Sequence, residues 1–190
     1  MQLFTIDGEF LYEDKEENYR ETVESAISKK IVLHRIDLRY MKLRNADLRG
    51  ADLRNANLRG ADLRCANLCD ADLRYADLSE IDLRKANLCG TSLIGADLRG
   101  TYLRDAILRN ADLRYANLHD ANLRNADLRE ADLRSVELRS VELRDADLRG
   151  AAGAGLYGTD RNIGTDITEE LKKEKVNLKR KIIIRRRDYK

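Results

Sequence analysis

Several residue types are scarce or missing from this chain of 190 residues. It contains no proline and no tryptophan, and only 5% of its residues are aromatic. The absence of proline suits a backbone in which every turn needs its N–H donor. No charged amino-terminal segment followed by an apolar run opens the chain, and no stretch of about 18 apolar residues could span a bilayer. We therefore expect a soluble, cytoplasmic protein.

Residues that could carry chemistry are also few. The three cysteines, Cys65, Cys69 and Cys89, are an odd number without the spacing of a zinc site, which indicates reduced thiols rather than disulfides or a metal centre. The two histidines, His34 and His119, have no ligand or catalytic partner at a suitable spacing. We therefore expect a protein that is not an enzyme and that holds no cofactor or metal.

Charge is abundant but nearly balanced, with 36 lysines and arginines against 34 acidic residues. This balance argues against binding to nucleic acid through net charge alone. The distribution is uneven, because the first thirty residues are acidic, the last forty are basic, and the stretch between them is close to neutral. The acidic residues of the first thirty are Asp7, Glu9, Glu13, Asp14, Glu16, Glu17, Glu21 and Glu24.

The amino-terminal thirty residues have the pattern of a small cap. Residues 2–6 and 10–13 are predicted as two short strands, joined at Asp7 and Gly8 by a tight turn. Asp14 is placed as a helix N-cap with Glu17 three residues later, in the pattern of a capping box. One apolar helical face would then contain Tyr19, Val23, Ala26 and Ile27. We expect this hairpin and helix to cover the first coil of whatever follows.

A leucine stands at every fifth position from residue 38 to residue 148, usually with alanine two residues before it. A period of five fits neither the helix nor the strand, so it indicates a coil whose corners recur every five residues. A typical unit is Ala71-Asp72-Leu73-Arg74-Tyr75. Alternation places the alanine and leucine inside and the aspartate and arginine outside, and the fifth residue forms the corner.

This motif of a small residue, Asn or Asp, Leu, a polar residue and a variable one resembles that of the pentapeptide repeat family, over residues 36–150. The resemblance implies an all-β solenoid, a right-handed quadrilateral β-helix in which four units make one square coil. Residues twenty apart would then stack at about 4.8 Å, and about six coils would give a rod on the order of 27 Å long. We assign residues 1–30 to the cap, 31–152 to the β-helix and 153–190 to a carboxy-terminal helix and basic tail.

The outward charges admit two interpretations. In the twenty-residue register, arginines form one continuous ladder and aspartates form a row beside other arginines, which would give a neutral, soluble surface. The family also includes acidic rods that mimic duplex DNA, bind type II topoisomerases such as gyrase and confer resistance to drugs or toxins. This chain differs, because arginine largely cancels its carboxylates, no aromatic residue occupies the core position and no loop leaves the rod. DNA mimicry is therefore the alternative.

Interruptions of the outward rows point to a partner-binding surface. Ile94 replaces an arginine, and Tyr75 and Tyr115 would flank Gly95 beside it. On the adjoining sides, Cys69 and Cys89 replace consecutive arginines one coil apart and are predicted as adjacent thiols, with Ile107 and Tyr102 nearby. Clusters of exposed apolar residues often mark contacts. The sequence therefore predicts a non-enzymatic interaction scaffold whose candidate contacts are Tyr75, Ile94, Tyr115, Tyr102 and Ile107.

The carboxy-terminal segment has two possible roles of its own. A helix is expected from about Asp166 to Lys175, with Glu169 completing a capping box. The tail beyond it contains three consecutive isoleucines, residues 182–184, which suit a strand packed on the last coil. Alternatively its basic cluster contacts nucleic acid or an acidic partner. The resemblance to the pentapeptide repeat family, whose members often dimerise through carboxy-terminal modules, also implies that the tail could join two rods end to end as a homodimer. The basic residues concerned are Lys179, Arg180, Lys181, Arg185, Arg186 and Arg187.

Overall fold

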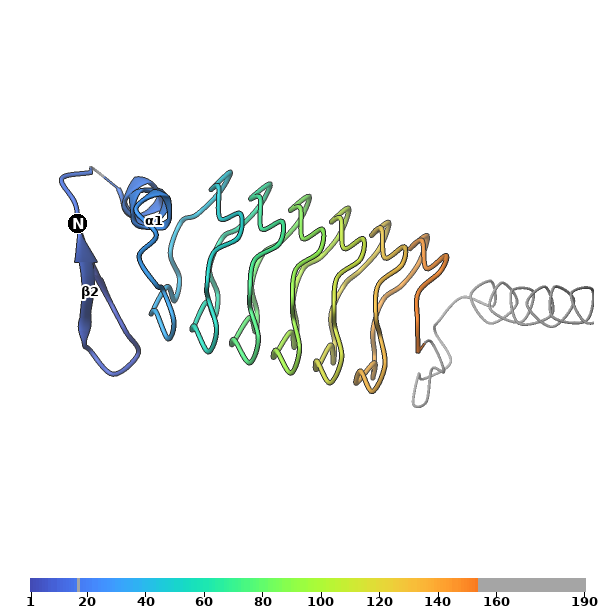
Figure 1. The fold of residues 1–190 in the computed structure, drawn as a ribbon. Coiled ribbons are helices and arrows are strands. Elements are labelled where there is room, and N and C mark those ends of the chain that lie inside the picture. The colour runs from blue at the N-terminus through green and yellow to red at the C-terminus, as the bar shows by residue number, and fades with distance from the viewer. Residues whose placement is uncertain (17, 154–190) are drawn as a thin grey trace, which may run out of the picture.

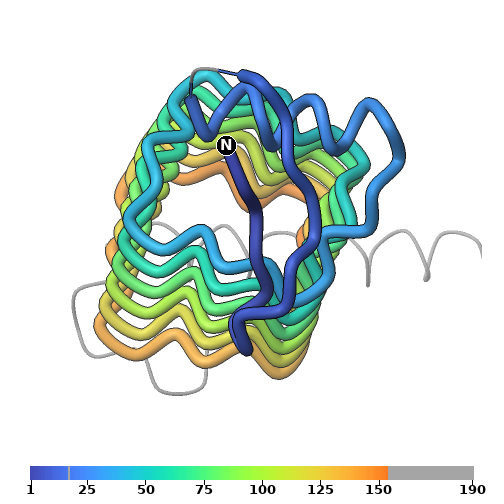
Figure 2. Tube along the Cα trace, turned by 90° about the vertical axis from the view of Figure 1, so that its left-hand side faces the viewer, coloured from blue at the N-terminus to red at the C-terminus, as the bar shows by residue number. Residues whose placement is uncertain are grey.

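The computed structural model describes residues 1–16 and 18–153 as a rod of stacked coils closed at its amino-terminal end by a hairpin and a helix (Figure 1). Strands β1 (Gln2–Phe4) and β2 (Phe10–Glu13) form the hairpin, and α1 (Tyr19–Ser28) follows. Viewed along the rod, the coils superpose into a four-sided outline, and the hairpin runs across its open end (Figure 2). The chain is thus an all-β solenoid with a cap.

The hairpin joins the cap directly to the first coil. β1 and β2 are antiparallel, with Gln2 opposite Glu13 and Phe4 opposite Phe10. β1 ends before the predicted residue 6, at Phe4. Thr5 begins the turn of the hairpin, where its N–H donates to the carbonyl of Glu9 at 2.8 Å, and it also forms an antiparallel bridge with Ile36 of the first coil. Asp37 N–H donates to the carbonyl of Phe4 at 3.0 Å, so the coil continues the hydrogen bonding of the hairpin.

The helix begins later than the sequence predicts. Asn18, not Asp14, is its N-cap, and its side chain accepts a hydrogen bond from Glu21 N–H at 3.0 Å. The predicted capping box of Asp14 and Glu17 is therefore wrong. The Asp14 carboxylate instead binds Lys29 at 2.8 Å and accepts hydrogen bonds from Tyr12 and Ser25, which ties the hairpin to the end of the helix.

Each coil contains twenty residues, as parallel bridges between residues twenty apart show along the whole rod. On one side Asp52 bridges to Asp72, Asp72 to Ser92 and Ser92 to Asp112. The backbone bonds between coils repeat with this period, for example from Leu53 N–H to the carbonyl of Asp72 at 2.8 Å. Four five-residue units therefore make one coil, as the resemblance to the pentapeptide repeat family implies.

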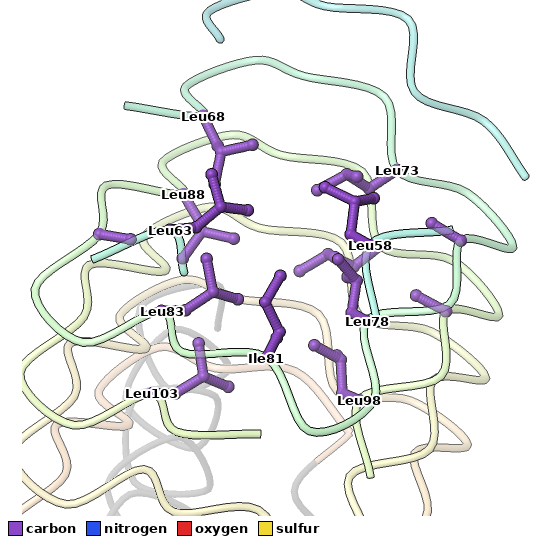
Figure 3. Packing of buried hydrophobic residues seen from close by; sticks show 14 of the residues in the cluster. Leu58, Leu63, Leu68, Leu73, Leu78, Ile81, Leu83, Leu88, Leu98 and Leu103 are labelled. Atoms are coloured by element: carbon purple, nitrogen blue, oxygen red, sulfur yellow. The ribbon is translucent and has the colours of Figure 1, made fainter. Parts of the chain in front are cut away.

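Leucine columns fill the interior of the rod. Most of these leucines are completely buried, and the alanines two residues before them fill the space near the corners. Figure 3 shows Leu63, Leu83 and Leu103 stacked on one side, opposite Leu58, Leu78 and Leu98, with Ile81 pointing between them. Burial of one leucine contributes roughly 1.5 to 3 kcal/mol, so the columns are the main stabilising feature of the fold.

The corners are tight turns with a left-handed residue. At one of them Ala46 N–H donates to the carbonyl of Leu43 at 3.1 Å, and the intervening Asn45 has φ of 60°. A positive φ at the third residue is typical of a type II turn. Glycine and asparagine suit this conformation, but Tyr75 and Tyr115 adopt it as well, with φ of 59° and 61°. A tyrosine in this left-handed conformation costs about 1 to 2 kcal/mol relative to glycine, so the backbone at these two corners is strained.

The last described coil is less well covered than the others. Leu138 and Leu148 are 7% and 8% exposed, whereas Leu73 and Leu93 are fully buried. The regular leucine frame ends at Gly153, which occupies the next leucine position. The predicted helix from Asp166 and the basic tail lie outside the described residues. Within the described part of the chain, no helix has the length and apolar character needed to cross a membrane.

Candidate functional site

About half of the units carry an ion pair between their own second and fourth residues. In one of them Arg54 Nε and Nη2 lie 2.8 and 2.6 Å from the two carboxylate oxygens of Asp52, and Arg54 N–H donates to the same carboxylate at 3.3 Å. These hydrogen bonds from Arg54 lower the pKa of Asp52. The same Asp-Leu-Arg arrangement recurs at arginines 39, 49, 64, 74, 84, 99, 114, 129, 134 and 149.

A weaker contact links such pairs from coil to coil. Arg54 Nε lies 3.7 Å from Asp72 of the next coil, and Arg114 Nε lies 3.7 Å from Asp132. Opposite charges therefore alternate along the face as well as within each unit. This arrangement supplies a guanidinium beside nearly every aspartate of the repeat, so the acidic row does not form a stripe of unneutralised charge.

The network of ion pairs is interrupted over part of one coil and resumes after it. Residues 86–96, between Lys85 and Asp97, contain no charged side chain. We call this stretch the uncharged band. In it Ser92 occupies the position that aspartate holds in the neighbouring coils, and Ile94 occupies the position of arginine. Arg74 therefore meets no carboxylate at position 92, and Asp112 meets no guanidinium at position 94.

Two tyrosines border the band at the corner that includes Gly95. Tyr75 and Tyr115 belong to the coils on either side and are 64% and 67% exposed. The sequence suggested a gap between them, but a Cβ atom at Gly95 would lie only 2.7 Å from Cδ1 of Tyr75. The Tyr75 ring thus covers Gly95. Ile94 beside it is half-buried, so this group presents two exposed rings and one partly covered aliphatic side chain.

The second predicted group continues the band around the corner at Gly90. Cys89 belongs to the band, Cys69 stands one coil before it, and both are free, half-buried thiols. Burial and the neighbouring Cys89 raise the pKa of Cys69, so the Cys69 thiol is not activated as a nucleophile. Ile107 follows in the next coil and is 38% exposed. Tyr102 is 53% exposed on the adjoining side of the same coil as Ile107.

The two histidines lie apart from the band and from each other. The His34 ring contacts the amide of Asn55 at 3.1 Å, and His119 Nδ1 lies 2.9 Å from Asp120. In residues 1–16 and 18–153, no group of three or more histidine, cysteine or acidic side chains is placed to hold a metal ion. The histidines therefore act in this structure as surface hydrogen-bonding residues. The predicted basic contacts from Lys179 to Arg187 lie outside the described residues.

Sequence reasoning missed a second aromatic surface, at the cap. Tyr40 is 69% exposed and covers Gly60 as Tyr75 covers Gly95. Nearby, a hollow of about 430 Å³ lies between the hairpin and the first coil, lined in part by Phe4, Tyr19 and Tyr40. The sequence shows several aromatic residues near the amino terminus, which could have indicated this surface. That they lie close together depends on how the hairpin packs against the first coil.

The chain matches a family model described as pentapeptide repeats, with 8 copies over segments 32–68, 51–88, 81–119 and 116–151. These segments overlap and together span well over half of the sequence. A search of curated proteins finds no match.

Several solved structures are similar to this chain. A pentapeptide repeat protein, Rfr23, from the cyanobacterium Cyanothece 51142 is 42% identical over 53% of this chain and 61% of its own, with a TM-score of 0.38. This chain thus spans less than two thirds of that relative. HetL from Nostoc sp. strain PCC 7120, involved in heterocyst differentiation regulation, is 27% identical over 68% of this chain and 78% of its own, with a TM-score of 0.27. QnrB1, a plasmid-mediated fluoroquinolone resistance protein, is 21% identical over 71% of this chain and 70% of its own, with a TM-score of 0.48.

Proposed function

Because this chain belongs to the pentapeptide repeat family, we propose that it is a non-enzymatic scaffold that binds another protein through the uncharged band and its two flanking tyrosines. The observation that carries the proposal is the interruption of the ion-pair network at Ser92 and Ile94. On the same side of the rod, the units before and after this one keep aspartate and arginine paired, as Asp72 with Arg74 and Asp112 with Arg114. Here the same backbone instead presents small, apolar and aromatic side chains.

The energetics of desolvation favour this part of the rod. A partner that covers an Asp-Leu-Arg unit must remove water from a bidentate ion pair whose members already satisfy each other. A partner that covers the band removes water mainly from serine, cysteine, isoleucine and glycine. Tyrosine is among the residues that contribute most to protein interfaces, and Tyr75 and Tyr115 project from the coils on either side.

The proposal is tested by affinity capture from host lysate with the intact protein and a band variant carrying Tyr75→Ala, Ile94→Arg and Tyr115→Ala. Ile94→Arg restores the usual residue of the motif, so the fold should be retained. A matched control carries Tyr40→Ala, which removes an equally exposed corner tyrosine, and His119→Arg, which restores an arginine elsewhere. We expect a partner that binds the intact protein and the control but not the band variant. Capture of the same partners by all three proteins would refute the proposal.

The alternative expected from the sequence is a DNA mimic that binds a type II topoisomerase. Its support is the resemblance to the family, in which QnrB1 is described as a fluoroquinolone resistance protein. The paired arginines oppose it, because they supply positive charge along the rows where a mimic needs phosphate-like charge. The capture experiment separates the two, since topoisomerase bound equally by the intact protein and the band variant would favour the mimic.

A further inference from the structure

The outer face of the hairpin exposes aromatic residues at the end of the rod. Phe4 and Phe10 are 40% and 57% exposed, and their rings meet edge to face with centroids 6.1 Å apart. Gln2 and Glu13 lie opposite each other in the same sheet, and Leu3 on the inner face is buried against the first coil. Ile6 in the following turn is 42% exposed. The cap therefore hides the first coil but leaves an apolar surface of its own, which we call the cap face.

Unpaired carboxylates surround this cap face. Asp7 and Asp14 form ion pairs with Arg35 and Lys29. By contrast, among residues 1–16 and 18–153, no ion pair is formed by the exposed side chains of Glu9, Glu13 and Glu16. Glu9 precedes Phe10 directly, and Glu13 ends the same strand. Lys15 and the terminal amino group of Met1 supply positive charge in the same part of the chain, but neither forms an ion pair with these three carboxylates. The rim thus carries three carboxylates without an ion pair among the described residues.

The chain itself contains a segment of the complementary chemistry. Residues 179–187 read Lys-Arg-Lys-Ile-Ile-Ile-Arg-Arg-Arg, three aliphatic residues between two basic clusters. We propose that the cap face binds this carboxy-terminal segment of a second copy of the chain. The isoleucines would contact Phe4, Phe10 and the hollow beside them, and the basic residues would pair with the acidic rim. This proposal is independent of the partner proposed for the uncharged band.

The cap face and the end of the described chain lie at opposite ends of the rod. The cap closes one end, and the described chain leaves the rod at the opposite end, at Gly153 (Figure 1). A second rod placed in line brings its cap next to Gly153, where the described chain ends. The 25 residues between Gly153 and Lys179 are also long enough to span a rod on the order of 27 Å, so binding within one molecule is the competing outcome of the test.

The contact joins two different surfaces, so it is head to tail. Such a heterologous contact leaves one free cap and one free segment at the ends of an open assembly, which can continue into longer chains of rods, or it closes into a ring. A contact between two carboxy-terminal segments would instead stop at a dimer and would not need the cap. The two arrangements therefore respond differently to changes in the cap.

Charge reversal on each surface of the full chain tests the proposal. The cap variant carries Glu9→Lys and Glu13→Lys, and the tail variant carries Arg185→Glu and Arg187→Glu. Sedimentation velocity at low ionic strength, after nuclease treatment, should show intact protein at no less than twice its monomer mass of 21.8 kDa at high concentration. Each variant alone should remain monomeric. Their equimolar mixture, and a variant carrying all four changes, should associate again because a cap and a segment of opposite charge are both present.

A control variant with Asp70→Lys and Glu80→Lys makes the same charge change at two corners in the middle of the rod, where Lys85 shows that lysine is accommodated. It should associate like the intact protein. Intact protein that stays monomeric at every concentration, a cap variant that still dimerises, or a mixture that does not associate would each overturn the proposal. The first result would indicate binding within one molecule, the second a contact between two tails. An increase in mass that nuclease abolishes would assign the segment to nucleic acid instead.

Discussion

At the corners of the coils, side chains lean toward the coil that follows. Tyr40 lies against Gly60, and Tyr75 lies against Gly95, each at a separation that leaves no room for a Cβ atom. The sequence shows that a tyrosine and a glycine stand twenty residues apart, but it does not show in which direction the ring leans. Gly95 is thus required by its neighbour as well as by its own φ of 66°.

Replacement of Gly95 by alanine should lower stability more than replacement of Gly50. Both residues have positive φ, so alanine costs about 1 to 2 kcal/mol at either position. Only at Gly95 would the new methyl group also meet a ring, since nothing lies within 4 Å of a Cβ atom at Gly50. Urea unfolding followed by circular dichroism measures the difference.

The double variant Tyr75→Ala with Gly95→Ala isolates this contact. Removal of the ring should return the cost of Gly95→Ala to that of Gly50→Ala. Equal costs for the two glycine substitutions, with or without Tyr75, would show that the ring does not rest on Gly95.

A second residue-scale prediction concerns the leucine core beneath the band. Leu93 is fully buried, so Leu93→Ala should lower the free energy of unfolding by about 2 to 5 kcal/mol. Leu148→Ala in the less covered last coil should cost less, because that side chain is already 8% exposed. Denaturant titration of both variants provides the comparison, and a larger loss for Leu148→Ala would contradict this account of the core.

Among the structural elements, the Asp-Leu-Arg unit gives the surface its dependence on pH. Hydrogen bonds from the arginine two residues later lower the pKa of Asp37, Asp52, Asp62, Asp72 and Asp112. A carboxyl group with a lowered pKa in the folded state stabilises the fold above its unfolded pKa, near 3.9, and loses this contribution as the pH falls toward the folded value.

The contribution of these carboxylates to the free energy of unfolding should therefore stay constant from about pH 8 to pH 5 and should decrease below about pH 4. Urea titrations at pH 7, 5, 4 and 3 measure the change, and added salt should reduce the difference between pH 7 and pH 3 because the pairs are partly exposed. A free energy of unfolding that rises on acidification would be inconsistent with the paired carboxylates.

The sequence predicts the repeat far better than it predicts the cap. Period, core and corner follow from the leucine and alanine positions because each unit repeats one local rule. The first residue of the helix does not follow from the sequence, because Asp14 and Asn18 are both suitable N-caps. The choice between them depends on the contacts of Asp14 with Lys29 and Tyr12. The band was visible as lost charges, but the covering of Gly95 by Tyr75 depends on the packing of one coil on another.

For the whole molecule, stacking makes stability a sum of contacts between neighbouring coils. The first coil is covered by the hairpin, and its Ile36 and Leu38 are fully buried. The coil of residues 133–152 has partly exposed core residues such as Leu138. The two ends of the rod are therefore not equivalent.

Hydrogen exchange measured by mass spectrometry should show this asymmetry. Peptides from residues 133–152 should exchange first, those from the first coil later, and those from the middle coils last, because end coils open without disrupting the rest. Uniform protection along the rod, or earliest exchange in the first coil, would contradict the predicted difference between the two ends. The intact protein should be measured at low concentration, so that association does not protect the ends.

The twenty-residue register also governs how such a rod can change its length over evolution. Insertion of a single five-residue unit would preserve the leucine core but turn every later side chain by about a quarter revolution, which would move Tyr115 away from Tyr75. Insertion of a full coil would lengthen the rod and leave both residues on the same side. Duplication in steps of one coil thus conserves a surface, whereas smaller steps generate new ones from the same motif.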